Sequence, residues 1–216
     1  MSTTAPATTG FALSPQQARW WALGGTDHPA FLARAVIEIT GPLDVGRLEG
    51  ALADLSARFE VLRTRFQALP GVSVPLQVIE EPSPLPLDKK TLGPGALPDA
   101  LAAELEQLAS QAIQGERKPL ALRLLELGPE RHALLLVQPS GLADRRGLEN
   151  LCRELARSYQ ARLEGRQLEA EEVQYADLAQ WQNEVLADPE HRLGGDYFAD
   201  VAARGALALA LPGRRA

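Results

Sequence analysis

One stretch, residues 134–148, joins an apolar run to a tight loop and then to an amphipathic helix. Residues 133–137 are all aliphatic, and Gln138-Pro139-Ser140-Gly141 breaks the run before a helix predicted at 146–163. A loop between a strand and a helix is a usual place for chemistry, because it projects from a rigid scaffold. This loop has no His, no Cys and one carboxylate, Asp144. Its position is therefore typical of an active site, whereas its residues are not.

Strand and helix patterns alternate along the whole chain. Strands are predicted at residues 31–40, 61–67, 76–80, 119–127 and 131–138, from β-branched content, alternation and flanking turn residues. Helices are predicted after Ser14-Pro15 and at residues 45–59, 97–113, 146–163, 175–186 and 190–202. Residues 81–87 contain three prolines and are expected to be irregular, whereas residues 206–211 alternate between Ala and Leu. The interleaving predicts an α/β fold, with helices packed on a mixed central sheet.

Composition limits the class of protein. With 216 residues, 45% of them hydrophobic and 23% charged, the chain fits one globular domain, here predicted as residues 12–216 after a disordered leader at residues 1–11. A net charge of −6 without a basic cluster disfavours nucleic acid and anionic membranes as partners. The single cysteine, Cys152, fits a reducing compartment, and no signal or membrane-spanning segment is evident. A cytoplasmic location is expected.

Three segments resemble signature motifs of one family. Residues 14–21 (SPQQARWW) resemble S-x-A-Q-x-R-x-W, and residues 58–66 (RFEVLRTRF) resemble R-H-E-x-L-R-T-x-F with Phe59 in place of His. Residues 175–182 (YADLAQWQ) resemble Y-x-D-Y-A-x-W-Q. In this order the segments are similar to the first, second and fourth motifs of the condensation domains of nonribosomal peptide synthetases. The resemblance implies a lobe like that of chloramphenicol acetyltransferase.

The third family motif, H-H-x-x-x-D-G, is degenerate in this chain. When its Asp is aligned with Asp144, Pro139 and Ser140 occupy the two His positions and Arg145 occupies the Gly position. The pattern of the related cyclising domains, D-x-x-x-x-D-x-x-S, fails as well, because it would need Asp at Pro139 and Ser at Gly147. The resemblance therefore implies no catalytic residue at Pro139 or Ser140.

Asp144 is the residue of the loop that matches the motif best, and two roles are open for it. The resemblance implies a structural salt bridge between Asp144 and Arg63 of the second motif. The sequence alone offers the alternative that Asp144 caps the helix that follows, since Asp is a favoured N-cap residue. Neither role is catalytic.

The remaining reactive side chains favour structural interpretations. Ser140 has no adjacent base to activate it, and Pro-Ser-Gly is an ordinary turn composition. The three histidines are not spaced as metal ligands, and Cys152 fits a buried structural thiol. Packing roles are also predicted for the three tryptophans, which lie inside family motifs: Trp20, Trp21 and Trp181.

The resemblance covers only the first of the family's two lobes. Family members form amides between substrates carried as thioesters on the phosphopantetheine of carrier proteins, and no directly bound cofactor or metal is expected. We therefore predict a non-catalytic module that contacts an adenylation domain, a carrier protein or a partner lobe. The alternative is an atypical condensation or acyl-transfer enzyme whose channel is completed by another lobe or subunit, for instance through self-association.

Overall fold

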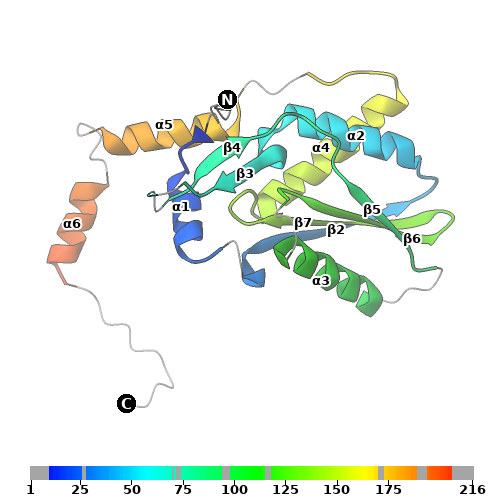
Figure 1. Cartoon of the computed structure of the whole chain (residues 1–216), viewed down its shortest axis with the longest axis horizontal. Coiled ribbons are helices and arrows are strands. Elements are labelled where there is room, and N and C mark those ends of the chain that lie inside the picture. Colours follow the sequence, from blue (N-terminus) through cyan, green and yellow to red (C-terminus); the bar gives the residue numbers. More distant parts are fainter. Residues whose placement is uncertain are drawn as a thin grey trace, which may run out of the picture.

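A four-stranded mixed sheet forms the centre of the molecule (Figure 1). The computed structural model describes residues 10–25, 28–69, 71, 74–93, 98–114, 118–169, 173–188 and 194–205. Along the sheet the strands are β2 (Leu32–Thr40), β7 (Arg131–Pro139), β6 (Ala121–Gly128) and β5 (Leu87–Thr91). β7 is antiparallel to both β2 and β6, whereas β5 is parallel to β6. The predicted mixed central sheet is confirmed.

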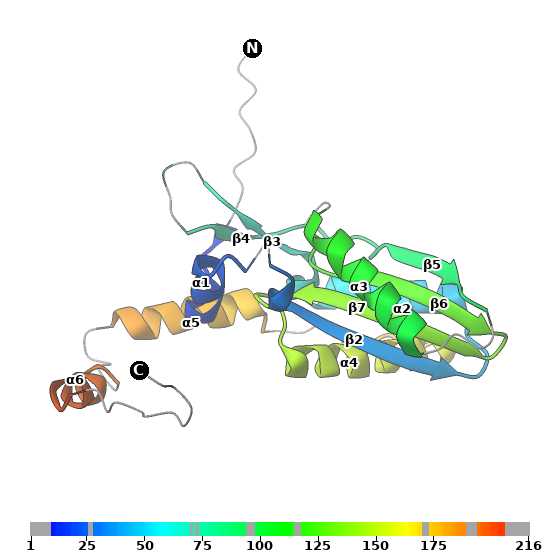
Figure 2. The same cartoon turned by 90° about the horizontal axis from the view of Figure 1, so that it is seen from below.

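Helices cover both faces of this sheet (Figure 2). α2 (Val45–Arg58) and α4 (Arg145–Leu163) pack on one face, and α3 (Pro98–Gln114) packs on the other. Successive side chains of β7 alternate between the two cores, with Leu134 and Leu136 on the α2–α4 side and Leu135 and Val137 on the α3 side. Burial on both faces explains why the β7 sequence is a continuous apolar run.

α2 and α4 are also joined by polar contacts. Arg58 Nη1 donates to Glu154 Oε2 at 3.0 Å, and Arg162 donates to both carboxylate oxygens of Asp54 at 2.6 and 2.7 Å. Partial burial raises the pKa of Glu154, but hydrogen bonds from Arg58 and Arg157 outweigh that effect and hold the pKa below its usual range. These contacts hold the middle and the C-terminal end of α4 against α2. α4 is the helix that follows the motif loop.

A second, three-stranded antiparallel sheet stands beside the first. It contains β1 (Gly10–Phe11), β4 (Leu76–Ile79) and β3 (Thr64–Gln67), with β4 in the middle. The predicted disordered leader is therefore too long, because Gly10 and Phe11 pair with Val78 and Gln77. Residues 1–9 lie outside the described part of the chain.

The remaining elements lie around the second sheet and at the end of the chain. α1 (Pro15–Ala22) begins with a capping box in which the Ser14 hydroxyl and the Gln17 side chain each accept from the other's backbone amide. Two short 3₁₀ turns follow, η1 (Pro29–Phe31) and η2 (Glu60–Arg63), and the chain continues after α4 with α5 (Tyr175–Ala187) and α6 (Gly195–Ala203). Within the described residues no helix combines the length and apolarity needed to cross a bilayer.

Three local predictions differ from the structure. The strand predicted at residues 61–67 starts only at Thr64, because the chain first makes η2, where the Thr64 hydroxyl donates to the Glu60 carbonyl at 2.7 Å. β5 begins at Leu87, the end of the segment predicted to be irregular, and its centre, Asp88-Lys89-Lys90, has no apolar alternation that would indicate a strand. The helix predicted at residues 190–202 begins at Gly195, and residues 206–211 lie outside the described residues.

Candidate functional site

The loop between β7 and α4 occupies the place expected for the catalytic motif. Ser140 N donates to the Phe31 carbonyl at 2.8 Å, and the amides of Leu142 and Ala143 donate to the Pro139 carbonyl at 2.8 and 3.2 Å. These bonds close the loop into a turn held against η1. The Ser140 side chain is exposed, whereas Gly141 is buried.

Trp20 of the first motif packs directly on this loop. A Cβ atom added to Gly141 would lie 2.6 Å from Trp20 Cε3, and one added to Gly25 would lie 2.2 Å from Trp20 Nε1. The indole is therefore held between two glycines, and its ring centroid lies 5.1 Å from that of Phe66 of the second motif. The two motifs and the loop form one packed unit.

A buried glutamine pair fixes the same loop to the second sheet. Gln17 Nε2 donates to Gln77 Oε1 at 2.9 Å and to the Gly141 carbonyl at 3.1 Å. Gln77 Nε2 in turn donates to the Ala12 carbonyl at 2.8 Å. Because both amides are buried and hydrogen-bonded, they position backbone groups and are not offered to a ligand.

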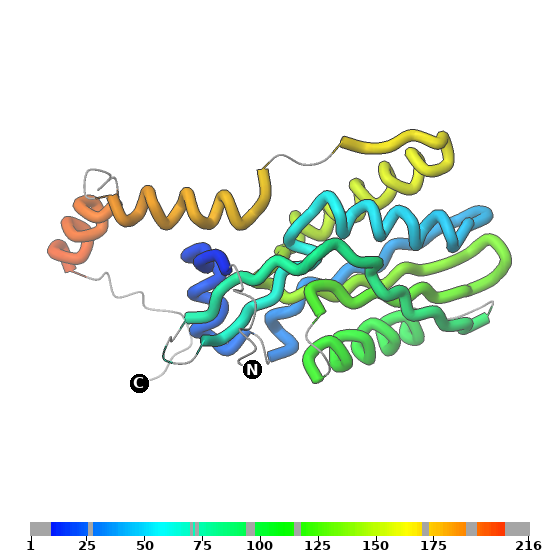
Figure 3. Tube along the Cα trace, turned by 45° about the horizontal axis from the view of Figure 1, so that its top comes forward, coloured from blue at the N-terminus to red at the C-terminus, as the bar shows by residue number. Residues whose placement is uncertain are grey.

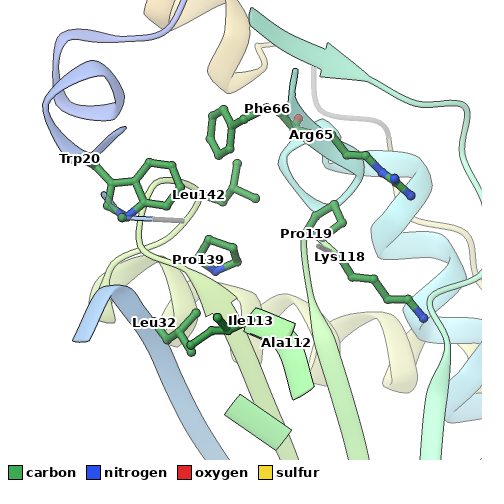
Figure 4. Close-up of a pocket in the computed structure, with 12 residues that line it drawn as sticks. Trp20, Leu32, Arg65, Phe66, Ala112, Ile113, Lys118, Pro119, Pro139 and Leu142 are labelled. Carbon is green, nitrogen blue, oxygen red and sulfur yellow. The ribbon is translucent and has the colours of Figure 1, made fainter. Parts of the chain in front are cut away.

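A cavity of about 170 Å³ opens beside the loop (Figure 4). Pro139 and Leu142 line it from the loop, and Trp20 and Phe66 line it from the first two motifs. The charged ends of two rim residues, Arg65 and Lys118, point away from Trp20 (Figure 4). Among the described residues, the lining contains no His, Cys, Asp or Glu. The cavity can hold an apolar group, and its described lining includes none of the His, Asp, Glu or Cys side chains that commonly act as general bases.

The described histidines do not supply the missing base. His132 lies at the opposite end of β7 from Ser140, roughly 26 Å away along an extended strand. His28 accepts a hydrogen bond from the Ala30 amide at 3.1 Å and caps η1. His191 lies outside the described residues. The part of the chain that the structure describes also contains no group of three His, Cys, Asp or Glu side chains placed to hold a metal ion.

The structure corrects the salt bridge expected between Asp144 and Arg63. Asp144 is exposed, and its Oδ1 accepts from the Gly147 amide at 2.7 Å as the N-cap of α4. Arg63 donates to the carbonyls of Ser56 and Glu80 and pairs with Glu60 at 3.5 Å. An exposed carboxylate needs no buried partner, and the start of α4 directly after Asp144 supplies the amide that it caps.

Substitutions of Asp144 distinguish its role as the N-cap of α4 from a role in a salt bridge. Asp144→Asn keeps a good N-cap and should change the free energy of unfolding by less than about 0.5 kcal/mol, whereas Asp144→Ala should cost about 1 kcal/mol. Urea unfolding followed by circular dichroism measures both values. A loss of several kcal/mol in Asp144→Asn would instead indicate a charged partner.

Cys152 and the tryptophans differ in exposure. Cys152 is half-buried on α4, and burial raises the pKa of its thiol, which disfavours the thiolate form. Trp20 is buried, as predicted for a packing residue, and Trp21 lies beside it at a centroid distance of 6.4 Å. Trp181, in contrast, is 57% exposed on α5.

Trp181 is one of several exposed apolar side chains on α5 and α6 that the sequence analysis did not identify. α5 and α6 extend from the body of the molecule (Figure 3). Tyr197 and Phe198 on α6 are 66% and 68% exposed and pack edge to face at 5.3 Å. We call this set the α5–α6 apolar surface, and its members are Leu178, Trp181, Leu186, Tyr197, Phe198 and Val201. Large aromatic side chains exposed in this way are typical of contact surfaces.

The fold, the three motifs and the degenerate loop define a class of protein. The family model of the condensation domain matches residues 8–216, and the chain belongs to this family. A similar curated protein is CymA of Salinispora arenicola (strain CNS-205), described as a probable nonribosomal peptide synthetase, which is 34% identical over 192 residues. A dimodular nonribosomal peptide synthase of Bacillus subtilis (strain 168) is 32% identical over 196 residues. The matches cover 84% and 85% of this chain but only 2% and 8% of those proteins.

Solved structures show the same lobe within larger chains. The X-domain in its complex with OxyB from teicoplanin biosynthesis is 26% identical, with a TM-score of 0.76 over 100% of this chain and 48% of that chain. The starter condensation domain of the rhizomide synthetase RzmA is 19% identical, with a TM-score of 0.74 over 92% of this chain and 49% of that one. The chain thus spans about half the length of these structural neighbours.

Proposed function

We propose that this chain is a non-catalytic condensation-like lobe that acts by contact within a nonribosomal peptide synthetase system. The main observation in support is the cavity at the motif loop, whose described lining is mostly apolar and contains no His, Cys, Asp or Glu. Side chains of the first two motifs, Trp20, Gln17 and Phe66, are used for packing around that loop. The packing role of the family motifs is retained at a site whose chemistry is lost.

The α5–α6 apolar surface supports a role in contact. Burying an exposed aromatic side chain at an interface contributes more than burying a scattered aliphatic one, and hot spots are enriched in Trp and Tyr. We propose that this surface binds an adenylation domain, a carrier protein or a partner lobe. The complex of the similar X-domain with OxyB is an example of such a fold bound to another protein. That example supports contact as a function without identifying the partner of this chain.

The first test is of turnover. The purified chain, incubated with acyl and aminoacyl thioesters on carrier proteins, should form no amide or ester, because the loop has no His and its one carboxylate, Asp144, serves as the N-cap of α4. Mass spectrometry of the carrier proteins measures the products, with a two-lobed condensation domain as positive control. Ser140→Ala should behave like the unaltered protein. A condensation activity that Ser140→Ala abolishes would contradict the proposal.

The second test is of contact. Trp181→Ala should weaken binding to the partner domain by about 2 kcal/mol, roughly thirtyfold in Kd, if Trp181 is an interface anchor. Calorimetry with adenylation domain, carrier protein and second lobe as separate titrants identifies which one binds. Gln180→Ala, at the exposed neighbouring position on α5, is the matched control and should leave Kd nearly unchanged. Equal affinities for the two variants would remove this surface from the proposal.

A second candidate function is an acyl-transfer enzyme completed by another lobe. The open cavity beside Pro139 favours it, because a partner could close that cavity and supply the missing groups. Catalysis would then rest mainly on positioning two thioesters, which can lower a barrier substantially. Turnover that needs both this chain and a separate second lobe would select this candidate over the first.

A further inference from the structure

The outer edge of β2 offers unpaired backbone groups. Ser140 N donates to Phe31 O and Gly41 N donates to Glu130 O, and both contacts continue the register that places Leu32 opposite Pro139. In an antiparallel ladder, hydrogen-bonded pairs alternate with pairs that are not bonded. The odd-numbered residues of β2 therefore bond to β7, and the even-numbered ones direct N–H and C=O outward. Pro139, which has no N–H, lies opposite an even-numbered residue, as this parity requires.

The same edge is accessible. Val36 is 41% exposed, and the Glu38 and Thr40 side chains are also exposed. α3 and α4 cover the two faces of the sheet and leave the side of β2 open (Figure 2). A groove lies between β2 and α4, with Arg145 and Glu149 on its helix side. Among the described residues, β2 hydrogen-bonds to β7 as its only strand neighbour.

The side chains on this edge are complementary to themselves. Arg34 and Glu38 lie two residues on either side of Val36 and point to the same face of the strand. If β2 meets a second β2 in antiparallel orientation with Val36 at the centre, each Arg34 lies opposite the Glu38 of the other copy. The hydrogen bonds can form in this register as well. Val36 of each copy directs its N–H and C=O outward, so the two Val36 residues can bond to each other. Opposite charges at directly paired positions stabilise a sheet.

We propose that β2 pairs antiparallel with β2 of a second copy of this chain, on a two-fold axis at Val36, so that the two central sheets become one. The contact is isologous, as a two-fold interface must be. Arg34 also bonds to Glu106 of α3 and to the Pro29 carbonyl, so its side chain is ordered before a second copy binds. This surface is separate from the α5–α6 apolar surface, and the inference does not depend on the proposed function.

Other registers are less favourable. Sliding one strand by two residues keeps the hydrogen-bonding parity but places Arg34 opposite Val36 or Thr40, which loses both ion pairs and shortens the ladder. Charges on an edge strand often prevent pairing with other strands. Charges of opposite sign placed symmetrically about Val36 have the reverse effect when the partner is an identical strand, because each meets its counter-charge.

The test is sedimentation velocity across a wide range of protein concentration. The unaltered chain should show a reversible monomer–dimer equilibrium. Glu38→Arg should raise the dimer dissociation constant by about tenfold or more, because it replaces both ion pairs with like charges. Val36→Pro should abolish dimerisation, because proline removes an outward amide at the two-fold axis. The β2–β7 ladder does not use that amide, so the fold should be retained.

A charge exchange makes the test specific. Arg34→Glu, combined with Glu106→Arg to keep the contact with α3, should also fail to dimerise alone. Mixed with Glu38→Arg it should form a heterodimer, because both facing pairs then have opposite charges. Arg34 of one chain faces Glu38 of the other, and the arginine introduced at position 38 faces the glutamate introduced at position 34. Glu81→Arg is the matched control for charge, since Glu81 is exposed and lies outside β2.

Three results would overturn the inference. They are a chain that stays monomeric at every concentration, dimers that persist in Val36→Pro, and dimers lost in Trp181→Asp but kept in Glu38→Arg. The last pattern would place self-association on the α5–α6 apolar surface and would leave the proposed contact function intact.

Discussion

Arg123→Met should lower the free energy of unfolding by about 3 kcal/mol, since it removes the buried cation that donates charge-assisted hydrogen bonds to several side chains at once. The Arg123 side chain is only 5% exposed in β6. It donates to Asp88 of β5 at 2.7 Å and to Glu104 of α3 at 2.8 Å. It also bonds to Gln107 and Gln111, each at 2.9 Å. One guanidinium thus joins the edge strand β5 to the helix that covers it.

Lys90→Met is the matched control for this prediction. Lys90 pairs with the same carboxylate, Glu104, at 2.6 Å, but its side chain is 44% exposed. Solvent weakens such a pair, so the control should cost less than about 1 kcal/mol. Urea unfolding followed by circular dichroism measures both variants. Equal losses would show that burial of Arg123 does not determine the contribution of the network.

Gly141→Ala should destabilise the protein by about 2 kcal/mol, because the added methyl group cannot fit without moving a packed indole. The new Cβ would lie 2.6 Å from Trp20 Cε3, and Gly25 also lies against that indole. Displacing Trp20 would also disturb its contact with Phe66 and the bond from Gln17 to the Gly141 carbonyl. The melting temperature should fall accordingly.

Gly46→Ala, the matched control for Gly141→Ala, should not destabilise the protein. Gly46 lies in the first turn of α2, and a Cβ there meets only Asp44 Oδ1 at 3.4 Å. Alanine in a helix is favoured over glycine by about 0.5–1 kcal/mol, so this variant should be as stable as the unaltered chain or more stable. If Gly141→Ala were equally harmless, the packing of Trp20 on the loop would not stabilise the fold.

Elements with strong periodicity could be predicted from the sequence, and elements defined by tertiary pairing could not. α2 follows from Asp44 as N-cap and apolar residues at steps of three and four, and β7 follows from its continuous apolar run. β5 has no such pattern, because it is a charged edge strand whose pairing with β6 determines its conformation. The sequence also did not predict that the strands form two separate sheets. One strand of the second sheet, β1, is only two residues long, which is too short to give a recognisable pattern.

The motif loop lies between a strand and a helix, as the sequence predicts, but the contacts of its residues were not all foreseen. Alignment on Asp144 placed Pro139 and Ser140 at the end of β7, where the structure has them. The partner of Asp144 depended on whether its carboxylate is buried, and sequence does not determine that. The contact of Trp20 with Gly141 joins residues far apart in the chain, so only the folded structure reveals it. The α5–α6 apolar surface was missed because exposed and buried aromatic residues look alike in a sequence.

The pairing of β2 with β7 has a consequence for the synthesis of the protein. Thr40 pairs with Arg131, so β2 leaves the ribosome well before its only strand neighbour among the described residues exists. At typical elongation rates of roughly 5–20 residues per second, the delay is on the order of 5–20 seconds. During that time both edges of an apolar strand are unpaired. Slowing translation should therefore increase aggregation of the nascent chain, and a chaperone that binds extended segments should suppress it.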